Sequence, residues 1–182
     1  HSPYGCSKGS ADQYMRDYYR IYGLKTVVFR QSCIYGPMQY GNEDQGWVAH
    51  FIIRAVNGEK INIYGDGKQV RDILEVNDLV SAYRYAIKNI NTTKGQIYNI
   101  GGGEENTFSL IELIEYLEKT LNKKIHIEFY NWRPGDQKIF ISNNKKFIKD
   151  TNWKIKIDKF EGMHRLIKWV EENFELIKKI RE

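Results

Sequence analysis

The 182-residue sequence predicts an α/β fold, because short apolar strands alternate with amphipathic helices along the chain. The expected strands are brief runs of β-branched and aromatic residues that end at glycine or proline. The expected helices repeat apolar residues at helical spacing. Hydrophobic residues make up 41% of the chain and charged residues 28%, which is typical of a globular protein. No apolar run approaches the roughly 20 residues that a membrane-spanning helix needs.

Helices and strands are expected in a regular order. The expected helices lie within residues 2–23, 45–58, 77–90, 108–122 and 160–180. The expected strands lie within residues 25–37, 61–67, 71–76, 95–103, 123–132 and 138–142.

Several helix ends carry local signals. Gly23 can cap the end of the opening helix, and Gly58 closes the second. Asn77 and Asp78 are expected to begin the third helix. Ser109, with Glu112 three residues later, predicts a capping box at the start of the fourth.

Two helices have a predicted apolar face. In the helix over 77–90 the apolar residues are Leu79, Val80, Tyr83 and Ile87. In the C-terminal helix they are Met163, Leu166, Ile167, Val170, Phe174 and Ile177.

The net charge of +5 is concentrated in the last third of the chain. Residues 123–182 hold 15 Lys and Arg against 9 Asp and Glu, whereas the first 122 residues hold 13 against 14. Such a surface is either a solvated lysine-rich face or a patch that binds nucleic acid or a phosphorylated small molecule. The first interpretation is favoured, because no nucleic-acid recognition motif accompanies the charge.

The cysteines and the first residues of the sequence indicate a cellular compartment. Cys6 and Cys33 lack CxxC spacing, and two cysteines make a poor disulfide framework for this length. Position 1 is His, and a polar, aromatic segment follows it in place of a cleavable signal. The sequence therefore predicts a reduced, cytoplasmic setting.

Two glycine-rich segments and the histidines carry no complete binding motif. YGDGKQV (64–70) has no third glycine, and IGGGEEN (100–106) has neither GxGxxG nor a P-loop Lys-Ser/Thr. Both are interpreted as turns. His1, His50, His126 and His164 are scattered without metal-ligand spacing, so no metal is predicted.

Tyr4 and Lys8 form a candidate catalytic pair. Residues four apart share one helix face, with about 5–6 Å between their Cβ atoms. An ammonium group beside a phenol favours the phenolate and prepares the phenol for proton transfer. Because the chain has 13 tyrosines, this spacing alone is also compatible with an ordinary surface pair.

Five motifs in a fixed order make the pattern more specific. They are SPYGCSK (2–8), VVFRQSCIYGP (27–37), IYGDGKQVRDILEVNDLVSA (63–82), YNIGGG (98–103) and NWRPGDQK (131–138). Together they resemble the extended short-chain dehydrogenase/reductases that act on nucleotide sugars. Within that family, Cys33 stands where most relatives have Asn. Cys33 and the Gln45-Gly46-Trp47 segment most resemble epimerases that act on CDP-linked sugars.

The resemblance implies a fold and its division. The chain is expected to be the C-terminal part of a Rossmann-type doubly wound sheet plus a smaller α/β substrate-binding lobe. Residues 1–36 and about 72–104 would complete the NAD-binding domain, and residues 37–71 and 105–182 would form the lobe. The glycine-rich N-terminal half, with its pyrophosphate-binding loop, and the Ser or Thr that partners the tyrosine, are expected to be absent.

The resemblance also implies site residues. Tyr4 would be the catalytic base and Lys8 would hold the nicotinamide ribose. Further cofactor contacts would come from Gln31, Ser32 and Ile34. Substrate contacts would come from Cys33, Gln45, Trp47, Gln69, Arg71, Arg133 and Asp136.

Several of these residues have a structural alternative. Arg71 beside Asp72 is also compatible with an ion pair, and the Arg133-Pro-Gly-Asp136 segment with a simple turn. Trp47 is equally compatible with a core position, and Cys33 is more often a packing residue than a reactive thiol.

The implied activity is an NAD-dependent epimerisation at C2 of a CDP-linked sugar for surface polysaccharide, or O-antigen, synthesis. The sugar is transiently oxidised by tightly held NAD, and the hydride returns to its opposite face. The chain alone is expected to be inactive. A homodimer through the opening helix is also implied, and no membrane partner. The alternatives are a nucleotide-sugar 4-epimerase, 4,6-dehydratase or decarboxylase of the same family, and a basic nucleic-acid-binding module.

Overall fold

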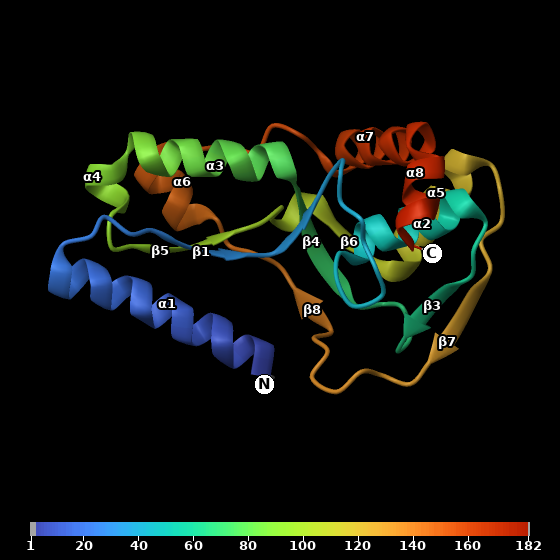
Figure 1. Cartoon of the computed structure of the whole chain (residues 1–182), viewed down its shortest axis with the longest axis horizontal. Coiled ribbons are helices and arrows are strands. Elements are labelled where there is room, and N and C mark those ends of the chain that lie inside the picture. The colour runs from blue at the N-terminus through green and yellow to red at the C-terminus, as the bar shows by residue number, and fades with distance from the viewer. Residues whose placement is uncertain (1–2, 182) are drawn as a thin grey trace.

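A computed structural model describes residues 3–181, in which helices and strands alternate (Figure 1). The helices are α1 (Pro3–Tyr22), α2 (Trp47–Asn57), α3 (Val76–Lys88), α4 (Ile90–Thr93), α5 (Leu110–Leu121), α6 (Lys145–Thr151), α7 (Lys159–Glu172) and α8 (Phe174–Arg181), with the 3₁₀ turn η1 (Glu104–Asn106). The strands are β1 (Val28–Gln31), β2 (Cys33–Tyr35), β3 (Ile61–Tyr64), β4 (Val70–Glu75), β5 (Ile97–Ile100), β6 (Thr107–Ser109), β7 (Ile127–Tyr130) and β8 (Ile139–Phe140).

Most strand pairs are parallel, which confirms the predicted α/β class. β1 pairs with β5, β2 with β4, β3 with β7 and β4 with β8, all in parallel. β6 lies antiparallel to β4. Parallel pairs need long crossover connections, and helices of this chain supply them.

Ser32 marks the point where one extended segment changes partner. Up to Gln31 the segment pairs with β5, and from Cys33 it pairs with β4. The Ser32 amide donates to the carbonyl oxygen of Ile100 at 2.8 Å, at the carboxyl ends of β1 and β5. In open parallel sheets this edge is where ligands bind.

Helices cover both faces of the β1–β5 pair. In Figure 1, α1 lies on one face, and α3 and α6 lie on the other. Asp12, the buried residue of α1, pairs with Arg30 of β1 and so attaches this polar helix to the sheet. On the opposite face Tyr98, Phe147 and Trp153 pack together with Leu74, Leu79 and the alanines of α3. This arrangement is that of a doubly wound sheet.

A second apolar cluster forms the other half of the molecule. It joins α2, α5 and α7 to the buried face of β3, where Ile61 and Ile63 alternate with Asn62 and Tyr64. Ile61 and Ile63 hold β3 in the core, and Asn62 and Tyr64 point toward a cavity. The capping box of Ser109 and Glu112 begins α5, as predicted.

At one place the membership of the two apolar clusters differs from the expected division into cofactor domain and lobe. Phe147 and Trp153 belong to the expected 105–182 lobe, yet they pack in the cluster of β5 and α3. Asp78 of α3 reinforces this packing by accepting from the amides of Lys156 and Ile157, at 3.0 and 2.9 Å. The segment after β8 therefore returns to the sheet before the chain enters α7.

Two local predictions differ from the structure. The C-terminal segment is not one helix, because α7 ends at Glu172, with Asn173 as its C-cap, and α8 begins at Phe174. In α3, Glu75 rather than Asn77 or Asp78 is the N-cap. The expected apolar face of α3 is also wrong in part. Leu79 is buried as expected, but the helix packs through Ala82 and Ala86 and leaves three apolar residues exposed: Val80, Tyr83 and Ile87.

Candidate active site

Tyr4 and Lys8 lie together in the first turns of α1. The Lys8 ammonium is 5.4 Å from the centre of the Tyr4 ring. Both residues line a groove of about 680 Å³ between α1 and β1, which also contains Arg30 and Gln31. Tyr4 is 64% exposed, so its phenol is accessible to a ligand in this groove. The helical spacing therefore puts the two groups within reach of one ligand.

A hydrogen bond to Asp72 fixes the segment that follows β1. The Ser32 hydroxyl donates to the carboxylate of the fully buried Asp72 and lies 2.8 Å from the Asp72 carbonyl oxygen. Asp72 also accepts from the Gly103 amide at 3.0 Å. Gly101 leaves no room for a side chain, because a Cβ there would lie 2.3 Å from the Asp72 carboxylate. Asp72 thus fixes the backbone at the carboxyl edge of the sheet.

Cys33 and Trp47 connect this edge to the second half of the molecule. The indole Nε1 of Trp47 donates to Sγ of Cys33 at 3.3 Å. Burial raises the pKa of the Cys33 thiol, which the hydrogen bond from Trp47 opposes. Cys33 is therefore held as a neutral thiol, in agreement with a packing role.

This environment predicts a difference between the two free cysteines. With iodoacetamide near pH 8 we expect Cys33 to react about tenfold more slowly than the exposed Cys6, because only the thiolate is nucleophilic and burial disfavours it. Mass spectrometry of the two peptides over time measures both rates. In urea the rates should converge. Equal rates in the folded protein would contradict the assigned environment.

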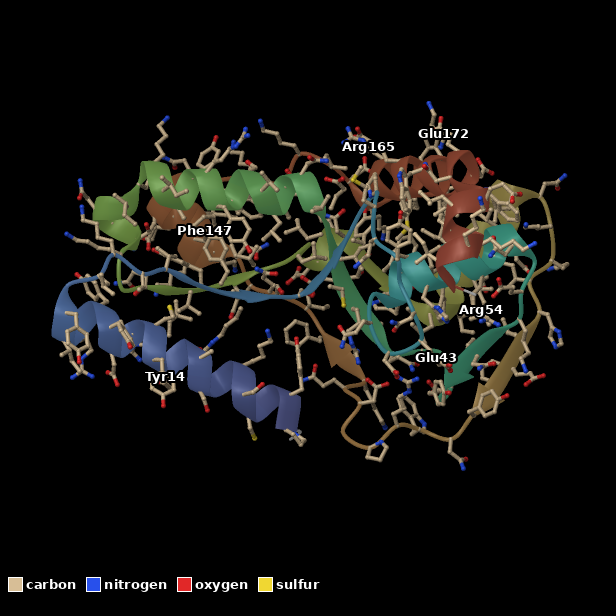
Figure 2. All side chains as sticks on the ribbon, viewed as in Figure 1. Tyr14, Glu43, Arg54, Phe147, Arg165 and Glu172 are labelled. Atoms are coloured by element: carbon tan, nitrogen blue, oxygen red, sulfur yellow. The ribbon has the colours of Figure 1, made fainter. Side chains whose placement is uncertain are left out.

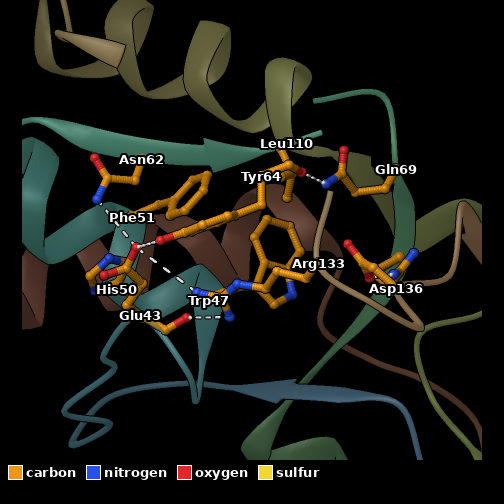
Figure 3. A pocket seen from close by; sticks show the side chains of 11 residues that line it. Glu43, Trp47, His50, Phe51, Asn62, Tyr64, Gln69, Leu110, Arg133 and Asp136 are labelled. Atoms are coloured by element: carbon orange, nitrogen blue, oxygen red, sulfur yellow. Dashed lines mark hydrogen bonds and ion pairs between the residues drawn. The ribbon is translucent and has the colours of Figure 1, made fainter. Parts of the chain in front are cut away.

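A cavity of about 180 Å³ opens beside Trp47 (Figure 3). Its wall combines aromatic rings with charged groups, which suits an amphipathic ligand. It is lined by Glu43, Trp47, His50, Phe51, Asn62, Tyr64, Gln69, Leu110, Arg71, Arg133 and Asp136.

Arg71 is the better buried of the two arginines in this cavity. Its NH2 group lies 2.7 Å from Oδ1 of Asp136, across 65 residues of sequence. The pairing with Asp72 that adjacency suggested does not occur, because β4 directs neighbouring side chains to opposite faces. Arg71 thus presents a fixed guanidinium to the cavity.

Arg133 is held by the opposite side of the cavity. Its NH1 group lies 3.3 Å from the Glu43 carbonyl oxygen and 3.4 Å from the Asp44 carboxylate. Its guanidinium also lies 4.1 Å above the centre of the Tyr64 ring. The Arg133–Asp136 segment is a turn, as its Pro-Gly sequence suggests, with the Asp136 amide 3.2 Å from the Arg133 carbonyl oxygen. The turn therefore carries two cavity residues.

Most of the predicted substrate residues meet at this cavity. Trp47, Gln69, Arg71, Arg133 and Asp136 line it. The buried Gln69 donates to the Tyr64 carbonyl oxygen at 2.6 Å, so its amino group supports β3.

Two predicted substrate residues, Cys33 and Gln45, do not line this cavity. Cys33 lies next to it and accepts from Trp47. Gln45 is exposed, and its backbone amide donates to Oδ1 of Asn42. Of the predicted cofactor residues, Gln31 lines the α1 groove and donates to the Tyr83 hydroxyl at 2.6 Å, whereas Ile34 packs against the cluster of β5 and α3.

Six lining residues were not predicted: Glu43, His50, Phe51, Asn62, Tyr64 and Leu110. The alternation in INIY was an available signal for Asn62 and Tyr64, since Ile61 and Ile63 claim the buried face. Glu43 lies in an irregular loop and has no comparable signal.

Within the described residues, 3–181, no group of His, Cys, Asp or Glu is arranged to hold a metal ion. Over the same residues, the helices are too short or too polar to cross a membrane.

The fold and cavity define an α/β enzyme class in which a Tyr-Lys helix flanks a parallel sheet and an arginine-lined cavity lies beside it. The sequence model of the NAD dependent epimerase/dehydratase family matches residues 1–101. The chain belongs to this family.

Individual relatives agree with this assignment. CDP-paratose 2-epimerase of Salmonella typhi is 44% identical over 93% of this chain. The structure of UDP-glucose 4-epimerase from Thermotoga maritima, solved with UDP-glucose, aligns with a TM-score of 0.86 at 30% identity over 96% of the chain. That of dTDP-glucose 4,6-dehydratase from Bacillus anthracis, solved with NAD, aligns with a TM-score of 0.83 at 33% identity over 96%. The chain covers 52%, 55% and 54% of these proteins, about half of each.

Proposed function

We propose that this chain supplies the catalytic Tyr-Lys pair and the nucleotide-sugar site of an NAD-dependent epimerase that acts on a CDP-linked sugar at C2. The observation that carries the proposal is the cavity with two arginines, joined to the α1 groove through the segment Gln31–Cys33. The identity of 44% to a CDP-paratose 2-epimerase favours this reaction over those of other family members. Surface polysaccharide synthesis is the corresponding biological role.

The arginines suit a diphosphate. A guanidinium pairs bidentately with phosphate oxygens, and Arg71 and Arg133 stand on opposite sides of one cavity. Trp47, which contacts Cys33, then lies where the sugar would pass from this cavity toward Tyr4.

The α1 groove fits one end of a dinucleotide. Lys8 is positioned to donate to ribose hydroxyls, Gln31 lines the same groove, and Ser32 and Ile34 follow at the sheet edge. NAD would accept a hydride from the sugar and return it. Tyr4 would take the proton of the sugar hydroxyl, and the Lys8 ammonium would stabilise the negative charge on the phenol oxygen. Neutral Cys33 and the indole of Trp47 would leave the sugar free of strong polar contacts on that side, which suits turning it over between the two hydride transfers.

The rest of the site would come from outside this chain, and we expect little turnover from the chain by itself. Residues 1–36 and about 72–104 would belong to the cofactor domain, and 37–71 with most of 105–182 to the substrate lobe. The exposed tyrosines of α1 support a homodimer through this helix. Figure 2 shows the side chain of Tyr14 pointing away from the sheet, and Tyr18 and Tyr22 are also exposed.

Calorimetric titration with CDP, UDP, GDP and dTDP tests the nucleotide assignment on the chain as it stands. Tightest binding of CDP is expected. Preference for UDP or dTDP would instead favour a 4-epimerase or a 4,6-dehydratase, and absence of binding by all four would overturn the proposed site.

Arg71→Ala is expected to weaken CDP binding by about 10–100-fold, because a charge-assisted hydrogen bond is lost and Asp136 keeps an unpaired charge beside the phosphates. Calorimetry measures the change. Arg54→Ala is the matched control, since Arg54 pairs with Glu59 at the far end of α2. Equal losses in both variants would show a general effect on folding rather than a role in binding.

A further inference from the structure

Arg133 lines the cavity on the side opposite Arg71. Its guanidinium stacks on the Tyr64 ring, 4.1 Å from the ring centre, and reaches Glu43 and Asp44 on the facing loop (Figure 3). A planar cation on an aromatic face uses the same surface that a nucleotide base would stack on. In this state Arg133 therefore covers an aromatic platform.

The charges around Arg133 do not favour a diphosphate as they stand. Arg71 faces Asp136, and Arg133 faces Glu43 and Asp44, so the cavity rim has two cations and three carboxylates. A diphosphate carries further negative charge. A guanidinium that separates from its carboxylate partner meets the diphosphate with its full charge.

Of these arginine–carboxylate pairs, the one between Arg133 and Glu43 is the weakest. Arg71 and Asp136 are paired at 2.7 Å with side chains 15% and 26% exposed, whereas Arg133 lies 3.9 Å from the Glu43 carboxylate. Glu43 does not depend on Arg133, because Tyr64 and Asn62 donate to it at 2.6 and 3.2 Å. These hydrogen bonds, Tyr64 first, hold the pKa of Glu43 below its usual value.

Arg133 begins the Arg133–Asp136 turn, in which Gly135 has a φ of 76° and open space where a side chain would stand. A shift of the Arg133 side chain needs no repacking of the apolar clusters, because it belongs to neither.

We propose that the Arg133 guanidinium covers the Tyr64 ring in the unbound protein and leaves it when a nucleoside diphosphate binds. The base of the ligand takes the ring face that the guanidinium vacates, and the guanidinium moves to the diphosphate. This inference rests on the proposed function of the cavity as a nucleotide site. In this exchange the diphosphate draws Arg133 away from the Tyr64 ring and so makes the ring accessible to the base.

The exchange predicts opposite changes for two ligands of one variant. Arg133→Ala exposes the Tyr64 ring and removes a phosphate partner. We expect it to bind cytidine about threefold more tightly than the unaltered chain, because the platform no longer has to be cleared. We expect it to bind CDP about tenfold more weakly, because a charge-assisted hydrogen bond is lost. Calorimetry with cytidine and with CDP measures both affinities.

Two further variants complete the test. Arg133→Lys keeps the charge but loses the planar stack, so CDP binding should fall less than in Arg133→Ala. Arg165→Ala removes a surface arginine paired with Glu161 on α7 and should change neither affinity.

Each outcome decides between explanations. If Arg133→Ala weakens cytidine and CDP alike, Arg133 is a simple anchor and the exchange is wrong, while the nucleotide site stands. An unchanged cytidine affinity in that variant likewise overturns the exchange. If the unaltered chain binds neither ligand, the proposed function fails and the exchange fails with it.

Discussion

Replacing Tyr4 with Phe is expected to lower kcat by about 10²–10⁴-fold in an enzyme that contains this chain, with NAD and a CDP-linked sugar present. The ring and its contact with Lys8 would remain, but the oxygen that accepts the sugar proton would be gone. Proton NMR of the sugar at C2 follows the reaction. Because binding contacts are kept, the affinity for CDP should not change.

Tyr116→Phe provides the control for this substitution. Tyr116 loses the same hydroxyl on α5, where its ring packs against Phe108 and Phe160. Its kcat should stay near that of the unaltered enzyme. A Tyr4→Phe enzyme that retains full turnover would remove Tyr4 from the proton transfer.

Trp153→Ala is expected to lower the free energy of unfolding by about 3–5 kcal/mol, as large-to-small substitutions in a core do. Trp153 is fully buried and packs on Phe147. Phe147, labelled in Figure 2, joins α6 to the sheet cluster. A loss of this size is a large part of the stability of a typical domain. Urea denaturation followed by circular dichroism measures it.

Trp132→Ala gives the comparison for stability. Trp132 is 40% exposed and lies on the loop after β7, so its loss should cost much less. A similar loss of unfolding free energy in both variants would contradict this. The segment after β8 would then not be the main support of the half that contains β1 and β5.

Features set by neighbouring residues could be predicted from the sequence. The capping box of Ser109 and Glu112 and the left-handed Gly58 that closes α2 depend on a few adjacent positions, and both occur. The order of helices and strands likewise follows from local periodicity.

Features set by distant packing could not. The apolar spacing of α3 fits two faces, and the structure uses the one with Ala82 and Ala86, because small side chains let the helix approach the sheet. The return of Trp153 to the sheet has no local signal either.

The candidate site shows the same division. Tyr4 with Lys8, and the arginines in their motifs, were predicted from the sequence. The pairing of Arg71 with Asp136 and the contact of Arg133 with Tyr64 were not, because each joins residues more than 60 positions apart. Glu43 became visible as a site residue only through these contacts.

The central claim is that the cavity beside Trp47 binds a nucleoside diphosphate. A crystal structure of the chain with CDP tests it most directly. We expect the diphosphate between the guanidinium groups of Arg71 and Arg133, and the cytosine ring on the face of Tyr64. CDP bound elsewhere, with the Arg133–Tyr64 stack undisturbed, would contradict it.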